Sequence, residues 1–167
     1  DFWAAVAVDQ DPRKEAKYRD KLLRDAIKNF AAVQSAEPHS EDQKVAAEAL
    51  CGTLEDILLH GLQGKSGKEY GAGVSTSIWD FIQHGVKTSG NQQLRNSIRQ
   101  VEKFQNVQTA DGRGRAWIRT VFSDEILIPA FSALVTAKQL QEHWYAPYAF
   151  MSSIEDTTTF VTALESL

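Results

Sequence analysis

The segment G-R-G-R-A-W-I-R, residues 112–119, places three arginines beside a tryptophan in a chain whose formal net charge is −4. We expect this segment to run as a helix toward Phe122. On a helix, Arg115 and Arg119 lie about one turn apart and share a face. Trp117 points to a different side, which predicts that it is buried. The segment therefore predicts a helix with a core face and a cationic face.

Two glycines, Gly112 and Gly114, predict a tight, exposed backbone path just before this helix begins. Backbone N–H groups at a helix N-terminus attract anions, and Arg113 would strengthen that attraction. Guanidinium groups also bind carboxylates through paired hydrogen bonds, either inside the fold or on another protein. An internal carboxylate that holds neighbouring helices is the more natural partner for Arg115. For Arg113 the internal role and the partner role are balanced.

Helical periodicity dominates the rest of the chain, and strict alternation of apolar and polar residues is scarce. Capping signals mark three helix starts: Asp11 followed by Pro12, Ser40 with Gln43, and Ser152 with Glu155. Apolar residues at three- and four-residue steps predict helices over 18–33, 45–58, 78–86, 94–104, 112–122, 131–140 and 160–164. Pro129 is expected near the start of its helix, and residues 63–73, rich in glycine and lysine, are expected to form a surface loop.

The expected fold is therefore all-α, with one globular domain over residues 1–167 formed by a bundle of about seven to eight helices. Its 167 residues are 43% hydrophobic, and a chain of this length buries roughly 70% of its unfolded surface. Cys51, the single cysteine, excludes an intramolecular disulfide and lies in an apolar run, as a core residue would. The first residue is not methionine, which suggests a piece of a longer, multidomain protein.

Several kinds of chemistry are disfavoured. The four histidines are dispersed, and neither H-E-x-x-H nor C-x-x-C is present, so we expect no metal site and no cofactor. G-K-S-G-K at residues 64–68 lacks the spacing of a phosphate-binding loop. No nucleophile–base pair stands out, so we expect no catalytic residue and no enzyme activity. A pI of about 5.6 disfavours nucleic acid as the partner, and no apolar run reaches the roughly 20 residues of a membrane span.

Two basic stripes follow helical spacing. The first contains Lys14, Lys17, Lys21, Arg24 and Lys28, and the second contains Arg95, Arg99 and Lys103. Such stripes are either solvated faces or patches for an acidic protein surface or anionic lipid. Acidic residues interrupt the first helix, which weakens the lipid interpretation.

Four blocks resemble the RUN domain family. Residues 50–62, L-C-G-T-L-E-D-I-L-L-H-G-L, resemble its early signature L-C-x-x-L-E followed by H-G-L. Residues 112–119 resemble its central block G-R-x-R-A-W-[LI]-R. W-Y-A-P-Y-A-F at 144–150 is similar to the family's later element F-Y-x-x-x-A-[FL]. W-D-F-I at 79–82 is similar to the short helix, centred on a tryptophan, that lies between these family blocks. The blocks follow family order over about residues 20–165, with a departure at T-V-F, where small aliphatic residues are usual.

The resemblance implies a non-enzymatic, α-helical adaptor that binds a GTP-loaded small GTPase of the Rab, Rap or Arf-like groups. It also implies a cytoplasmic location at endosomal, lysosomal or other vesicle membranes, reached indirectly through partners or other domains. The alternative is an adaptor that binds a motor or cytoskeletal protein, such as kinesin or myosin, independently of the GTPase nucleotide state.

In family members that bind Arf-like lysosomal GTPases, the implicated residues carry over to His60, Arg113 and Arg115. The full set of candidate partner-binding residues is His60, Arg113, Arg115, Arg119, Lys17, Lys21 and Arg24. A histidine at a helix C-terminus can also bond the last free carbonyls, so a structural role for His60 stays open.

Overall fold

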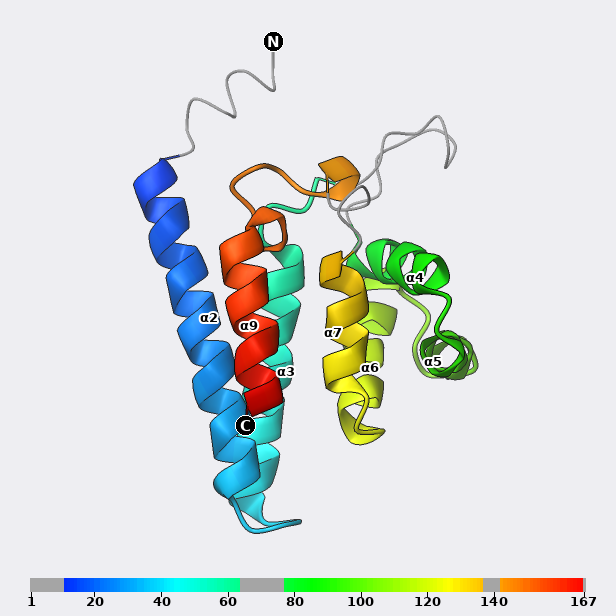
Figure 1. Ribbon diagram of the computed structural model, residues 1–167. Coiled ribbons are helices and arrows are strands. Elements are labelled where there is room, and N and C mark those ends of the chain that lie inside the picture. Colours follow the sequence, from blue (N-terminus) through cyan, green and yellow to red (C-terminus); the bar gives the residue numbers. More distant parts are fainter. Residues whose placement is uncertain (1–10, 64–76, 137–141, 167) are drawn as a thin grey trace.

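The computed structural model describes residues 11–63, 77–136 and 142–166 (Figure 1). The described helices are α2 (Pro12–Ser35), α3 (Glu41–Leu59), α4 (Ile78–Ser89), α5 (Gln92–Glu102), α6 (Ala110–Ser123), α7 (Leu127–Thr136), the short 3-10 helix η1 (Phe150–Ser152) and α9 (Ile154–Ser166). This part of the chain contains no strand, and its one β-bridge joins Leu62 to Tyr145. The all-α prediction is confirmed. The predicted loop at 63–73 and the end of the 131–140 helix lie largely outside the described residues.

The first two capping signals act much as predicted. The side chain of Asp11 accepts a hydrogen bond from the N–H of Arg13 at 3.0 Å. Ser40 accepts from the N–H of Gln43 at 3.1 Å. The Gln43 side chain reaches the N–H of His39 at 2.9 Å, because the N–H of Ser40 is already bonded to a backbone carbonyl. The N–H groups of His39 and Gln43, which have no acceptor within the helix, are therefore both hydrogen-bonded by side chains at the start of α3.

The third capping signal is one residue off. α9 starts at Ile154, and Ser153, not Ser152, accepts a hydrogen bond from the N–H of Asp156 at 3.2 Å. The hydroxyl of Ser152 donates instead to the carbonyl of Ala146 at 2.8 Å. Ser152 belongs to η1, where it holds the preceding turn.

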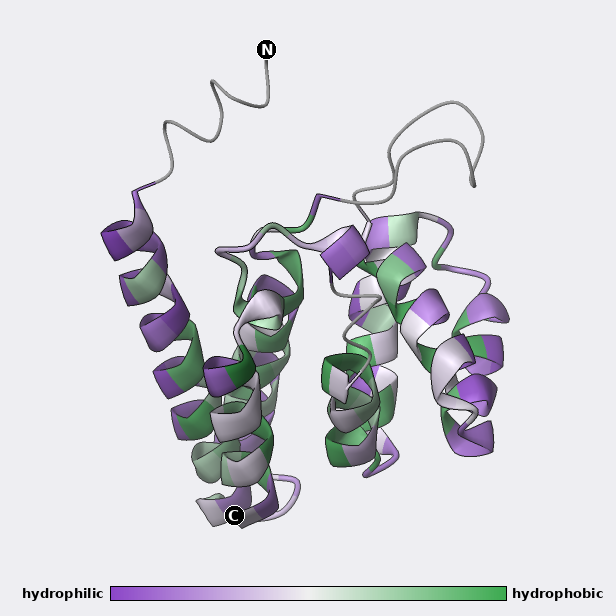
Figure 2. Ribbon diagram, turned by 45° about the horizontal axis from the view of Figure 1, so that its top comes forward, coloured by the Kyte–Doolittle hydropathy of each residue, from purple (hydrophilic) through white to green (hydrophobic). Residues whose placement is uncertain are grey.

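Five helices, α2, α3, α9, α6 and α7, run roughly parallel, and α4 and α5 lie across them at one side (Figure 1). Figure 1 shows α2, α9 and α3 together, with α7 and α6 alongside them and α4 and α5 beyond. Direct contacts join α2 to α3 and α9, α3 to α6, and α6 to α4, α5 and α7. Figure 2 shows hydrophilic residues on much of α2 and α5, the two outermost helices, and hydrophobic ones concentrated in α7. One buried core continues from the three-helix group through α6 and α7 to the inner sides of α4 and α5.

Aromatic side chains join the two groups of helices. Trp117 on α6 is fully buried, as predicted, and its indole N–H donates to Ser97 of α5 at 2.9 Å. Phe131 contacts both Trp117 and Phe160, and Phe160 contacts Phe150 edge-on. Burial of such large rings dominates core stability.

The predicted start of α6 is wrong. The helix begins at Ala110, and the side chain of Thr109 accepts the N–H of Gly112 at 3.0 Å. Both Gly112 and Gly114 are therefore inside the helix, not before it. Gly114 is required by packing: a Cβ there would lie 2.5 Å from Ile78 Cγ1. The close approach of α6 to α4, and not a tight turn, explains this glycine.

Candidate functional site

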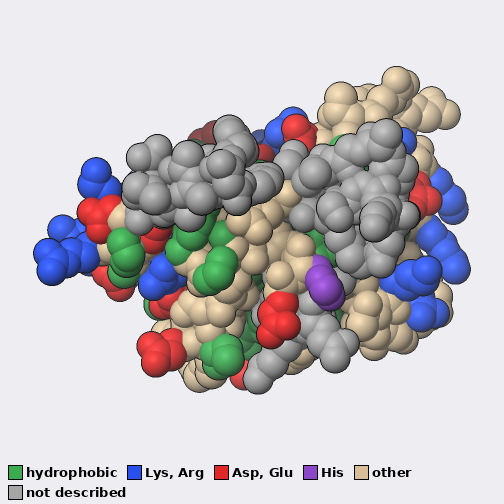
Figure 3. Space-filling model, turned by 90° about the horizontal axis from the view of Figure 1, so that it is seen from above, with side chains coloured by type: hydrophobic (Ala, Val, Ile, Leu, Met, Phe, Trp, Pro, Cys, Tyr) green, Lys and Arg blue, Asp and Glu red, His purple; other side chains and the backbone are tan. Residues whose placement is uncertain are grey.

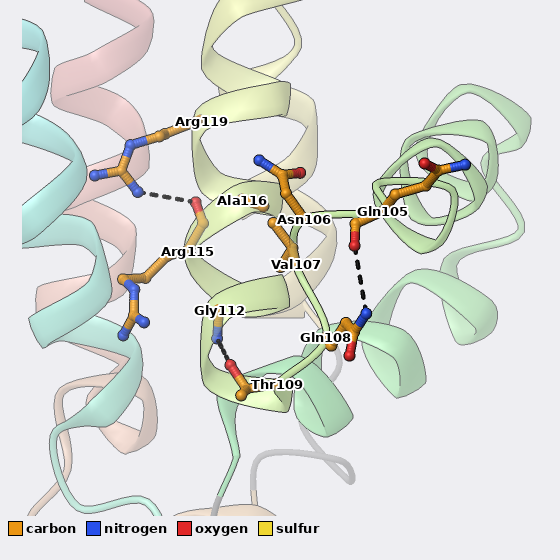
Figure 4. A pocket seen from close by; sticks show the side chains of 9 residues that line it. All are labelled: Gln105, Asn106, Val107, Gln108, Thr109, Gly112, Arg115, Ala116 and Arg119. Atoms are coloured by element: carbon orange, nitrogen blue, oxygen red, sulfur yellow. Dashed lines mark hydrogen bonds between the residues drawn. The ribbon is translucent and has the colours of Figure 1, made fainter.

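The exposed arginines of α6 extend toward α3 (Figure 4). Arg119 makes two contacts with the Glu48 carboxylate, at 3.3 Å from Nε and 2.8 Å from Nη2. One turn earlier, Arg115 Nη1 lies 3.5 Å from Glu55 Oε1. The Arg115 and Arg119 side chains remain 46% and 47% exposed. Each guanidinium is oriented by an acid of α3 and still presents about half of its surface to solvent.

Arg113 and Arg115 differ in exposure in the structure. Arg113, a candidate for facing a partner, is half-buried, and its Nε is enclosed without a hydrogen-bond partner in the described residues. Arg115, the candidate for a half-buried internal role, is exposed, although it does contact the internal carboxylate of Glu55. Arg113 lies four residues before the buried Trp117 and shares its side of α6, whereas Arg115 shares the exposed side with Arg119.

The ion pair with Arg119 changes the electrostatics of α3. The hydrogen bond from Arg119, with its positive charge, holds the pKa of Glu48 below the ordinary value of 4.5. Nearby, burial raises the pKa of the Cys51 thiol to about 11. Cys51 is 4% exposed, which confirms the prediction of a core residue, and a thiol in this state is a poor nucleophile at neutral pH.

A hollow of about 660 Å³ lies on the other side of the α6 arginines (Figure 4). Residues 105–109, which connect α5 to α6, form one wall, and Arg115, Ala116 and Arg119 form the other. A second hollow of about 490 Å³ shares Ala116 and Arg119 and continues toward Asp124. The walls combine amide, hydroxyl and guanidinium groups, which suits polar or acidic groups of another chain.

His60 lies inside the fold. Its Nε2 is 2.6 Å from Glu15 Oε2, and its Nδ1 accepts the backbone N–H of Phe150 at 3.0 Å. The rings of Tyr18 and Tyr148 contact it edge-on, and only 7% of the His60 side chain is exposed. The expectation that the ring bonds the last carbonyls of α3 is wrong. The side chain instead connects the end of α3 to α2 and to η1.

Leu58 and Gly61, on either side of His60, complete this connection. Gly61 has φ of 69°, and a Cβ there would lie 2.5 Å from Ala149 Cβ. Its carbonyl accepts the N–H of Ala146 at 2.8 Å, and the hydroxyl of Tyr145 donates to Leu58 O at 2.6 Å. The H-G-L and W-Y-A-P-Y-A-F blocks are therefore two halves of one packed structure.

Arg19 is a structural residue that sequence reasoning missed. Its Nε donates to Asp156 at 3.1 Å, and its Nη1 donates to the carbonyl of Tyr148 at 2.9 Å. The available signal was its spacing, because Arg19 follows Glu15 by four residues and precedes the buried Leu22 by three. It therefore lies on the inward side of α2, away from the basic stripe.

The basic stripe of α2 is exposed and forms a separate surface. Lys21 lies 3.7 Å from Asp25, and Arg24 lies 2.9 Å from Asp20. Lys17 has no ion-pair partner in the part of the chain that the structure describes. Figure 3 shows basic side chains at both lateral edges of the molecule, on the α2 side and on the α4 and α5 side. The predicted residues are not gathered in one site, because α3 and α9 lie between α2 and α6 (Figure 1).

Comparison with known proteins agrees with this architecture. The RUN domain profile matches residues 49–167. The chain belongs to the RUN domain family. Over 138 residues, 83% of this chain, it is 27% identical to mouse pleckstrin homology domain-containing family M member 2. It is 26% identical to the human protein of the same name over an equal length. The chain spans 12% of the length of each of these relatives.

RUN domains are protein-interaction modules that generally bind small GTPases. Among the described residues, no three histidine, cysteine, aspartate or glutamate side chains are grouped so that they could hold a metal ion. None of the helices in the described ranges combines the length and apolar character that crossing a membrane requires. Because the family consists of protein-interaction modules, the surfaces of interest are those that can receive another protein.

Proposed function

We propose that this RUN domain binds a GTP-loaded small GTPase of the Rab, Rap or Arf-like groups. It would act as a non-enzymatic effector in endosomal or lysosomal vesicle trafficking, with membrane contact made indirectly. Membership in the family supports the partner class, and the exposed pair Arg115 and Arg119 supports the site. Paired guanidinium groups of this kind suit carboxylates on a partner surface.

The proposal depends on the partial exposure of these two ion-paired arginines. Glu55 and Glu48 orient them at the surface without enclosing them. A partner carboxylate can approach the free side of each guanidinium without the loss of its internal partner. Such charge contacts at an interface set association rate and specificity as well as affinity.

The test is a binding screen with purified small GTPases of the three groups, each loaded with GTPγS or GDP. Biolayer interferometry should find at least one GTPase that binds the GTPγS form about tenfold or more tightly than the GDP form. Arg115→Glu should weaken that binding, while Arg95→Glu, an exposed arginine on α5, should not. If no GTPase of the panel binds in either state, the proposal is wrong.

The motor or cytoskeletal adaptor remains the second candidate because of the exposed α2 stripe. Lys17 is unpaired in the described chain, and Lys21 and Arg24 have only ion pairs within their own helix, which are weak at a surface. Pull-downs from lysate with added GTPγS or GDP separate the two functions. Equal recovery of kinesin or myosin in both states, lost in Lys17→Glu, favours the motor adaptor.

A further inference from the structure

Gly52 occupies the middle of α3 without an internal reason for being glycine. Gly52 is exposed to solvent, and a Cβ atom added to it would meet no atom within 4 Å. It does not have a positive φ, unlike Gly61 and Gly90. Glycine destabilises a helix interior relative to alanine, and the described residues show no packing that offsets this cost. Close approach of another chain's backbone is one physical use of such a position.

Gly52 lies on an outward stripe of α3 with four neighbours. On an ideal helix, Val45, Glu48, Gly52, Glu55 and Leu59 fall within an arc of about 80° and span about 21 Å. Val45 and Leu59 are 64% and 42% exposed, among the few large hydrophobic side chains at the described surface. The stripe thus has an apolar residue at each end and a bare backbone between them.

The arginines of α6 border this stripe. Arg119 binds Glu48 and Arg115 contacts Glu55, so the ion pairs lie on both sides of Gly52 along α3. We call the stripe and these two arginines the α3–α6 face. It combines exposed apolar groups, an open backbone position and oriented guanidinium groups, which is the composition of a protein interface.

We propose that the α3–α6 face is the docking surface for the small GTPase, with a backbone segment of the partner passing over Gly52. Carboxylates of the partner would reach Arg115 and Arg119, and apolar side chains would cover Val45 and Leu59. This inference rests on the proposed function and names its surface.

The charges of the face favour a protein over other occupants. The positive charges of Arg115 and Arg119 are matched by Glu55 and Glu48, so the face has no net charge. Anionic lipid and nucleic acid need a net positive surface. A protein can instead offer single carboxylates aligned with the arginines and apolar groups aligned with the ends of the stripe.

Substitution of Gly52 tests the surface separately from the fold. Gly52→Ala and Gly52→Gln introduce good helix-forming residues into open space, so both variants should fold, with Tm raised by about 2–4 °C. Gly52→Gln should weaken binding of the GTPγS-loaded GTPase by about tenfold or more, because its side chain occupies the approach path. Gly52→Ala should weaken it by about threefold or less. Thr162→Gln adds the same side chain to exposed α9 and should change neither quantity.

The outcomes are distinct. If the wild-type chain binds a GTPase and Gly52→Gln binds it equally well, the docking surface is wrong and the proposed function stands. If the wild type binds no small GTPase, the proposed function fails and this surface fails with it. Sedimentation that shows a wild-type dimer, converted to a monomer by Gly52→Gln, would make a second copy the occupant and overturn the proposal.

Discussion

The Nδ1 atom of His60 accepts a hydrogen bond from the backbone N–H of Phe150, 90 residues further along the chain, at 3.0 Å. Because Nδ1 is the acceptor, a neutral ring carries its proton on Nε2. This N–H donates a hydrogen bond to Glu15 Oε2 at 2.6 Å. A single side chain therefore joins α2, the end of α3 and η1. An effect of His60 on partner binding would act through the position of these elements.

Replacement of His60 by alanine should destabilise the fold. The change leaves the N–H of Phe150 without its acceptor and removes the contact with Glu15, at a cost of about 2 kcal/mol in the free energy of unfolding. Urea denaturation measures this quantity. His60→Asn retains an acceptor near the Nδ1 position and should recover part of the loss. If His60→Ala keeps wild-type stability yet fails to bind a partner, His60 contacts that partner directly.

Two helical glycines should respond to alanine in opposite directions. Gly52→Ala should stabilise the chain by about 0.5–1 kcal/mol, because alanine favours helix and the space is open. Gly114→Ala should destabilise it by about 1–3 kcal/mol, since the new Cβ would collide with Ile78. Thermal unfolding of both variants checks the signs. Equal effects of the two substitutions would show that the close packing of α6 on α4 is absent.

The Arg119–Glu48 pair should contribute a pH-dependent part of the stability. The pKa of Glu48 is lowered in the folded state, so the stabilisation is fully present above its unfolded value near 4.5. It is lost as the pH falls through the lower folded pKa. The difference in unfolding free energy between the wild type and Arg119→Ala should be small, because exposed pairs contribute about 1 kcal/mol or less. Urea denaturation at pH 7 and pH 3 should show that this difference shrinks at pH 3; an unchanged difference would contradict the assignment.

Local signals predicted the helices well because they depend on neighbouring residues. The cap at Asp11 and the burial of Trp117 follow from spacing within one helix. The ion-pair partners of Arg115 and Arg119 did not follow, because Glu55 and Glu48 belong to a different helix, α3.

Contacts between segments that are distant in the sequence could not be predicted from its periodicity. The partners of His60 lie 45 and 90 residues away, and no periodicity relates them. Arg19 had the spacing of the inward side of α2, but its acceptors on Asp156 and Tyr148 come from the other end of the chain. The family blocks predicted that these segments matter, and the packing explains why.

The central claim is that the exposed arginines of α6 bind a carboxylate of a small GTPase, and an exchange of charges tests it most directly. The double variant Glu48→Arg with Arg119→Glu restores an ion pair between α3 and α6, so its unfolding free energy should stay within about 0.5 kcal/mol of the wild type. Its affinity for the GTPγS-loaded GTPase, measured by interferometry, should nevertheless fall by about tenfold or more, because a glutamate now faces the partner's carboxylate. Wild-type affinity in this double variant would contradict the account.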